Sequence, residues 1–180
     1  MGFKLFMPDG CTTRTWLLFV LVLSVLTWSR ASAEPPVEPV PMLNLTAGQV
    51  GVFDNIDDPY RVGLEYRFRP LGRWQLIPAI GAAVAQNDAS FVYVDLRHDF
   101  WLGARWALIP SFGVGLFNDG DGLELGQTVE FRSGIELAYR FHEQWRVGLA
   151  LFHLSNGGLS DTNPGTEAVV LSLSIPLRGR

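Results

Sequence analysis

The side chains best suited to covalent chemistry lie near the carboxyl terminus, in the run His153-Leu154-Ser155-Asn156. His153 and Ser155 are two residues apart, so in a β-strand both side chains emerge on the same face. Asn-Gly-Gly and Asn-Pro-Gly then predict a turn-rich connection over 156–166, and Glu167 opens another strand-like run. If the two runs pair as a hairpin, Glu167 lies beside His153. A hydroxyl nucleophile, an imidazole base and a carboxylate that orients the base are the parts of a Ser-His-acid hydrolytic triad.

Residues 1–33 have the features of a secretory signal peptide. Positive charges precede an apolar run at 16–28, and Ala31-Ser32-Ala33 is a small-x-small cleavage site. The apolar run is short for a membrane-spanning helix, which makes a retained anchor the less favoured alternative. We therefore expect the mature chain to begin at Glu34.

Composition narrows the class of protein. The chain has 180 residues, enough for one domain. Cleavage after residue 33 removes its one cysteine, three of its 14 basic residues and one of its 18 acidic residues, which leaves a net charge of −6. This excludes a disulfide framework and does not suggest nucleic-acid binding. Residues 34–41 hold four prolines and predict an extended segment, so we assign the folded domain to 42–180.

The mature chain alternates apolar and polar residues with a period of two, which is typical of β-strands. In 60–69, for example, large apolar residues at even positions alternate with charged residues and glycine. Eight such runs occur, an even number, as closure of a single-chain barrel requires. The predicted strands are 42–53, 60–69, 74–85, 90–100, 105–116, 128–141, 145–155 and 167–176.

The two faces of these strands favour an eight-stranded antiparallel transmembrane β-barrel over a secreted sandwich. The apolar face carries aromatic residues at its ends, as a lipid-facing band with interfacial girdles does. The other face combines small residues with opposite charges, which suits a narrow interior filled by ion pairs. The charges expected inside are Arg61, Glu65, Arg67, Asp95, Arg97, Asp99, Glu130, Arg132, Glu136, Arg140 and Arg146.

The same alternation predicts where the reactive residues point. In the strand at 145–155 the small and charged residues occupy even positions, which marks that face as interior. His153 and Ser155 therefore continue the outward row, and Glu167 belongs to the outward row of the last strand. Long connections belong outside the cell, which places all three at the exterior end. Polar groups facing lipid are costly and indicate function, although polar residues at a strand end also occur simply at the water interface.

The pattern His153-x-Ser155-Asn156, followed by Asn163, Gly165 and Glu167, resembles the lipid A 3-O-deacylase (PagL-type) family of outer-membrane barrels. The stretch 122–141 also resembles that family. The resemblance implies an eight-stranded barrel in the bacterial outer membrane that hydrolyses the ester-linked acyl chain at the 3 position of lipid A. It also implies that Ser155 is the nucleophile, His153 the general base and Glu167 the residue that orients the imidazole.

An oxyanion formed in this reaction would need hydrogen-bond donors. The candidates are the backbone N–H groups of Asn156, Gly157 and Gly158 and the side chain of Asn163. Gly157-Gly158 is equally well explained as a turn. The scheme needs no cofactor and no metal. The loop at 118–124 has a faint likeness to a calcium-binding loop but lacks the spacing of an EF-hand, so a solvated loop is favoured.

The expected partners are lipid A or lipopolysaccharide as substrate and the lipids of the outer membrane, with a monomer and a homodimer both compatible with the sequence. Two alternatives remain open at this point. One is a non-catalytic barrel with a structural or adhesive role, in which the loops would carry the function. The other is an outer-membrane phospholipase that uses the same residues.

Overall fold

The computed structural model describes residues 39–53 and 59–177. The predicted signal peptide at 1–33 and residues 34–38 of the proline-rich segment lie outside these ranges. In chain order the elements are β1 (Met42–Val50), β2 (Tyr60–Arg67), β3 (Ile77–Ala85), β4 (Ser90–Arg97), β5 (Phe100–Leu102), β6 (Trp106–Asn118), β7 (Val129–Arg140), the 3₁₀ turn η1 (His142–Gln144), β8 (Arg146–Ser155) and β9 (Thr166–Pro176).

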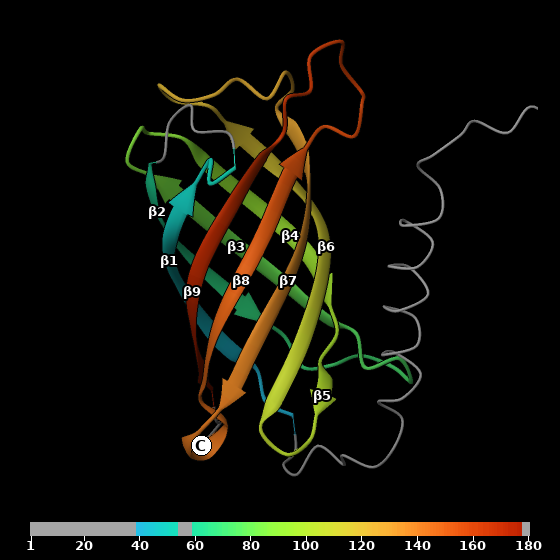
Figure 1. The fold of residues 1–180 in the computed structure, drawn as a ribbon. Coiled ribbons are helices and arrows are strands. Elements are labelled where there is room, and N and C mark those ends of the chain that lie inside the picture. The colour runs from blue at the N-terminus through green and yellow to red at the C-terminus, as the bar shows by residue number, and fades with distance from the viewer. Residues whose placement is uncertain (1–38, 54–58, 178–180) are drawn as a thin grey trace, which may run out of the picture.

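The strands form one closed antiparallel sheet. Sequence neighbours pair along the chain, and pairing of β1 with β9 and of β4 with β6 completes the barrel (Figure 1). None of the helical structure in the described ranges is long and apolar enough to cross a membrane. Backbone pairing within the sheet runs between neighbouring strands, the arrangement in which a β-sheet satisfies its own polar groups in lipid.

β4 and β5 are two parts of one wall strand. Both pair with β6 in the same register, from Arg97 opposite Ser111 to Phe100 opposite Leu108. Between them the His98 N–H donates to the Pro110 carbonyl at 3.2 Å, but proline has no N–H to return. The ladder is interrupted there without a change of register. The barrel therefore has eight wall strands, which confirms the predicted fold.

The predicted strand boundaries differ from the observed ones by up to three residues, and the two largest differences are of three residues. The first strand ends at Val50 rather than 53, and the third begins at Ile77 rather than 74. The second difference has a local cause, because Leu71 and Leu76 bridge across a tight turn in which Gln75 has a φ of 50°. Trp74 belongs to this turn and not to the sheet.

The interior is filled by a network of buried ion pairs. Glu65 accepts hydrogen bonds from Arg67 Nε at 2.7 Å and from Arg97 Nη2 at 3.0 Å. Glu136 accepts one from Arg67 Nη2 at 2.7 Å. Asp95 pairs with Arg97 and with Arg132. Each of these carboxylates meets two guanidinium groups, which compensates for the loss of solvent around the charges.

Three of the charges expected in interior ion pairs form none among the described residues: Arg61, Glu130 and Arg140, the last of which donates to the Ala104 carbonyl instead. Arg61 and Glu130 are buried, yet neither has an ion-pair partner among the described residues. The two residues enter from opposite walls, since three wall strands separate β2 from β7 in either direction around the barrel. Arg67 and Glu136 bridge the same two strands elsewhere in the interior, so the filling at the level of Arg61 and Glu130 decides whether charges meet there. An apolar cluster that includes Phe91, Phe152 and Leu154 occupies this part of the interior. The two charges thus do not meet.

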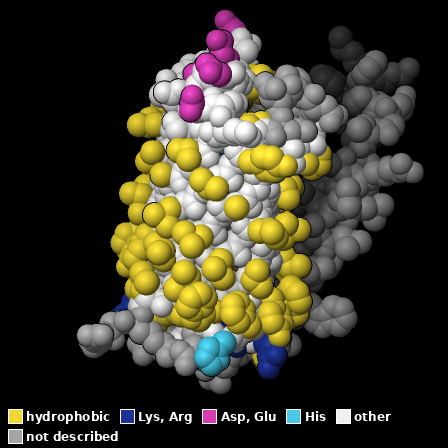
Figure 2. Space-filling view, turned by 90° about the vertical axis from the view of Figure 1, so that its left-hand side faces the viewer, with side chains coloured by type: hydrophobic (Ala, Val, Ile, Leu, Met, Phe, Trp, Pro, Cys, Tyr) yellow, Lys and Arg dark blue, Asp and Glu magenta, His cyan; other side chains and the backbone are white. Residues whose placement is uncertain are grey.

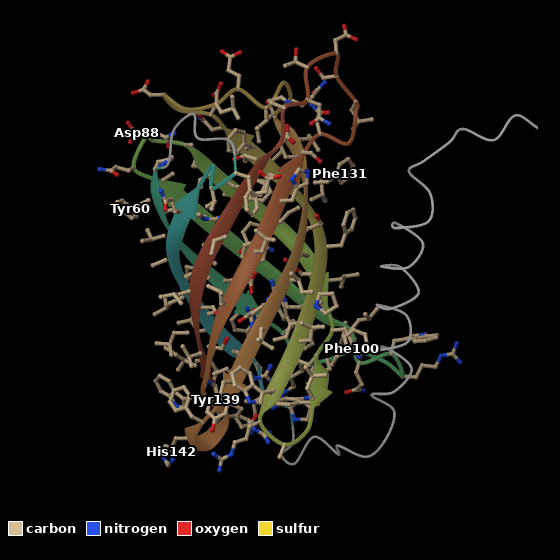
Figure 3. All side chains as sticks on the ribbon, in the orientation of Figure 1. Tyr60, Asp88, Phe100, Phe131, Tyr139 and His142 are labelled. Atoms are coloured by element: carbon tan, nitrogen blue, oxygen red, sulfur yellow. The ribbon has the colours of Figure 1, made fainter. Side chains whose placement is uncertain are left out.

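The outer face is apolar, as the alternation predicts. Hydrophobic side chains form a broad band, with acidic residues at one end and basic residues and histidine at the other (Figure 2). Tyr60 lies at one end of this band and Tyr139 at the other (Figure 3). Tyr139 packs edge-on against Trp106, with ring centroids 5.0 Å apart, in the predicted aromatic girdle. We call the end that carries the connections 86–89, 119–128 and 156–165 the long-loop end; it is uppermost in Figure 1.

Replacing Glu136 by alanine should destabilise the barrel strongly, because it leaves Arg67 and Arg97 buried without one of their acceptors. Removing one partner of a buried ion pair costs about 3–5 kcal/mol. Urea unfolding in lipid vesicles, followed by tryptophan fluorescence, measures the loss. Glu124→Ala is the matched control, since Glu124 is an exposed loop residue, and should change the free energy of unfolding by less than about 0.5 kcal/mol. Equal effects of the two variants would contradict the role of the network.

Candidate active site

The end of β8 presents His153 and Ser155 on the outer wall. The residues that alternate with them, Phe152 and Leu154, are only 3% and 4% exposed and point into the barrel. In β9, Glu167 lies directly opposite His153 in the strand register, between the buried residues Thr166 and Ala168. All three polar side chains therefore share the outward face at the long-loop end, where the alternation predicts them.

His153 and Glu167 are in direct contact. His153 Nδ1 lies 2.8 Å from Glu167 Oε1. The histidine side chain is 45% exposed and the glutamate 23%, so the pair lies at the surface of the wall. A carboxylate that accepts from Nδ1–H fixes the tautomer in which Nε2 carries the free lone pair. The arrangement supplies an oriented base on the outside of the barrel.

Gly165 packs against the imidazole, a contact that the sequence reasoning missed. Its φ is +68°, and a Cβ atom built there would come within 2.9 Å of His153 Cε1 and 3.6 Å of Nε2. Any other residue would be strained in this conformation and would press on the ring. The Asn-Pro-Gly signal predicted a turn at this position, but nothing local in the sequence shows which side chain the turn approaches.

Two serine hydroxyls lie on the outer face near His153. Ser133 of β7 is opposite His153 in the register, on the side away from Glu167, and is exposed. Ser155 is two residues further along β8 and lies opposite Phe131, which Figure 3 labels at this end of the barrel. The ring of Phe131 is stacked on Phe112, with centroids 6.1 Å apart, and gives Ser155 an apolar neighbour.

The position of the ring distinguishes these two serines. Because Cε1 and Nε2 lie close to Gly165, the ring leans toward β9 and toward the long-loop end. Continuing the register of β8 and β9 places Gly165 opposite Ser155. The edge of the ring that carries Cε1 and Nε2 thus lies beside Gly165, on the β9 side, at the level of Ser155.

Asn156 connects two loops. Its side chain is fully buried, and Nδ2 donates to the carbonyl oxygens of Leu125 at 2.9 Å and Thr162 at 2.8 Å. Its Oδ1 accepts from the N–H of Gly158 at 2.9 Å. This single amide therefore joins the β6–β7 and β8–β9 loops directly beyond Ser155. The sequence did not predict this contact of the Asn156 side chain, because Leu125 lies 31 residues away along the chain.

The other predicted oxyanion donors differ in their availability. The N–H of Asn156 donates to Asn163 Oδ1 at 3.1 Å, and that of Gly158 is used by Asn156 Oδ1. Within the described ranges no acceptor bonds the Gly157 N–H or Asn163 Nδ2. Because Oδ1 of Asn163 is already an acceptor, its amide is oriented with Nδ2 as the remaining donor.

No group of three or more His, Cys, Asp or Glu side chains in residues 39–53 and 59–177 is arranged to hold a metal ion. The polar groups at the end of β8 are a hydroxyl, an imidazole, a carboxylate and amide donors. This set suits nucleophilic attack on a carbonyl group.

Comparisons with known proteins identify the family of the chain. A family model described as Lipid A 3-O-deacylase (PagL) matches residues 60–176. The lipid A deacylase PagL of Bordetella bronchiseptica (strain ATCC BAA-588 / NCTC 13252 / RB50) is 27% identical over an alignment of 174 residues, which covers 86% of this chain and 92% of that protein.

Two solved structures share the fold. The crystal structure of the outer membrane enzyme PagL superimposes with a TM-score of 0.63 at 20% identity, covering 76% of this chain and 99% of that chain. The crystal structure of Neisserial surface protein A superimposes with a TM-score of 0.57 at 10% identity, covering 76% and 96%. At these identities the superpositions establish the barrel alone.

The family match is the more specific finding. It spans seven of the eight wall strands and includes the outward residues at the ends of β8 and β9. It therefore covers both the fold and the candidate site. The chain belongs to the lipid A 3-O-deacylase (PagL) family of outer-membrane β-barrel hydrolases.

Proposed function

We propose that this protein is an outer-membrane esterase that hydrolyses the 3-O-linked acyl chain of lipid A, with Ser155 as nucleophile, His153 as general base and Glu167 as the orienting carboxylate. The observation that carries the proposal is the 2.8 Å contact between His153 Nδ1 and Glu167 Oε1 on the outward face, two residues from Ser155. Family membership supports the reaction, and the lean of the imidazole supports Ser155 over Ser133.

The outward position of the site supports a lipid substrate. A lipid in the membrane meets the barrel through the apolar band, and its ester bonds lie near the interface at the end of the strands. His153, Ser155 and Glu167 lie at that end of their strands. A substrate dissolved in the leaflet would reach Ser155 from the side without entering the barrel.

The reaction proceeds in two acyl transfers. His153 Nε2 takes the proton of Ser155 as Oγ attacks the ester carbonyl, and Glu167 stabilises the imidazolium that forms. Collapse of the tetrahedral intermediate breaks the bond to the 3-oxygen of lipid A, which receives the proton from His153. Water then attacks the acyl-serine with His153 again as base, and the fatty acid leaves as Ser155 is regenerated.

The oxyanion donors in this proposal are the Gly157 N–H and Asn163 Nδ2. Both are free of acceptors in the described ranges, whereas the N–H groups of Asn156 and Gly158 already bond side-chain oxygens. The side chain of Asn156 holds the loop that carries these donors, because it donates to the carbonyl oxygens of Leu125 and Thr162. Donors fixed in advance stabilise a developing negative charge without further reorganisation.

Ser155→Ala should abolish deacylation. Mass spectrometry of lipid A from cells that express the wild type should show loss of one 3-hydroxyacyl group, and cells with the variant should retain it. Ser133→Ala is the matched control, because it removes the other outward hydroxyl beside His153, and it should remain active. Activity lost with Ser133→Ala and kept with Ser155→Ala would reassign the nucleophile.

Release of fatty acid from phospholipids but not from lipid A would favour a phospholipase.

Glu167→Gln should lower kcat by at least about tenfold and leave KM nearly unchanged, since the carboxylate orients His153 and stabilises its imidazolium without touching substrate. Purified protein in mixed micelles, assayed at several lipid A mole fractions, separates the two constants. Glu167→Asp keeps the charge and should recover part of kcat. A rise in KM alone would assign Glu167 to substrate binding instead.

Asn163→Asp should reduce kcat by about 10²–10³-fold, as loss of an oxyanion donor does in other enzymes. The substitution keeps an oxygen to accept the Asn156 N–H, so the loop should hold its conformation while Nδ2 is lost. The same lipid A assay measures the effect, with circular dichroism to check folding. Full activity of a folded variant would leave the Gly157 N–H as the donor.

A further inference from the structure

Arg61 is a buried cation whose charge is not neutralised in the described part of the chain. Its side chain enters the barrel from β2 and is 7% exposed, and no described carboxylate lies within ion-pair distance. Glu65, the nearest carboxylate along the same strand, is already paired with Arg67 and Arg97. A guanidinium removed from water without a partner is costly, so its retention needs an explanation.

Arg61 lines an interior cavity of about 260 Å³ at the long-loop end. The volume is close to the lower limit of ~300 Å³ for ordinary small-molecule sites. Most of the wall is apolar and includes Ala83, Phe91, Phe117 and Leu154. An apolar chamber with one buried cation fits a ligand that has an apolar body and an anionic group.

The charged residues around the cavity favour a ligand with a single negative charge over one with two. Arg61 is the one guanidinium or ammonium group among its described lining residues, and its planar fork matches a carboxylate in a bidentate pair. The exposed Glu124 also lines the cavity and would repel a dianion such as a phosphate monoester. The remaining polar side chains of the lining, those of Asn87, Ser90 and Thr166, are uncharged.

We propose that this cavity is a binding site for a fatty-acid carboxylate, held by Arg61 with its alkyl chain against the apolar wall. The site is distinct from the catalytic residues, because it lies inside the barrel and they lie outside. The reaction proposed above releases a ligand of this class, and that link alone rests on the proposed function.

The cavity and the catalytic residues share one wall. Leu154, which lines the cavity, lies between His153 and Ser155 in β8. Thr166 and Ala168, which also line it, flank Glu167 in β9. A ligand inside the barrel would therefore contact the inner surface of the two strand ends that carry the catalytic side chains.

Binding is tested with octanoate labelled with ¹³C at the carboxyl carbon, using the mature protein in lipid nanodiscs and empty nanodiscs as the blank. Titration followed by the ¹³C signal gives Kd without any lipid A. Arg61→Met keeps an unbranched apolar stem and removes the charge, and it should weaken octanoate binding by about tenfold or more. 1-Octanol, which has no charge, should bind wild type and Arg61→Met within about threefold of each other, since the apolar wall is unchanged.

Two further variants keep the test decisive. Ala83→Leu places a larger side chain in the cavity and should weaken octanoate and octanol alike. His153→Gln alters the outer face only and should leave octanoate binding unchanged. Heat-modifiable mobility on gels checks that each variant is folded.

Three results would overturn the proposal: no octanoate binding above the blank, equal binding by wild type and both cavity variants, or weakening by His153→Gln but not by Arg61→Met. The last would place the ligand at the outer site. Because octanoate binding is measured without lipid A, a failure here is distinguishable from a failure of deacylation, which the Ser155→Ala comparison tests.

Discussion

Closure of a sheet one strand thick is the constraint on which the rest of this structure depends. Pairing of β1 with β9 and of β4 with β6 closes the wall, so each wall residue faces either the interior or the outside. This alternation requires charge compensation inside and apolar contact outside. A polar group on the outer wall is then an exception, and the His153–Glu167 pair is such an exception at the strand ends.

The interior of the barrel is filled in one way in its middle and in another way toward the long-loop end. In the middle, three carboxylates and three arginines neutralise each other around Glu65 and Glu136. Toward the long-loop end the filling becomes apolar, and Leu125 from the β6–β7 loop is buried in it. Asn156 bonds the backbone of that residue, so the loop that closes the interior also holds the chain beyond Ser155. Stability of the barrel end and geometry of the site thus depend on the same hydrogen bonds.

Alternation made most of the fold predictable from sequence, since a period of two assigns each residue to a face without knowledge of its neighbours. It placed His153 and Glu167 outside correctly. It could not show which interior charges meet: Arg67 and Glu136 pair across the barrel between β2 and β7, whereas Arg61 and Glu130 on the same two strands do not pair, at a level filled by an apolar cluster. Contacts made across long sequence distances, such as that of Asn156 with Leu125, were likewise hidden. The break between β4 and β5 was also hidden, because its cause is the missing N–H of Pro110 on the neighbouring strand, and the sequence of residues 90–100 does not contain that residue.

Because the site faces outward, the substrate concentration that matters for this protein is the concentration within the membrane. In the proposed function, a catalytic group on the lipid-facing wall meets its substrate by lateral diffusion within a leaflet, so the encounter is two-dimensional. Its rate follows the mole fraction of substrate among the lipids around the barrel and is insensitive to the volume of the surrounding solution. Inert lipid or detergent that dilutes the surface slows the reaction even when the total amounts of protein and substrate are constant. The composition of the membrane therefore acts on this site as directly as a change of substrate concentration acts on a soluble enzyme.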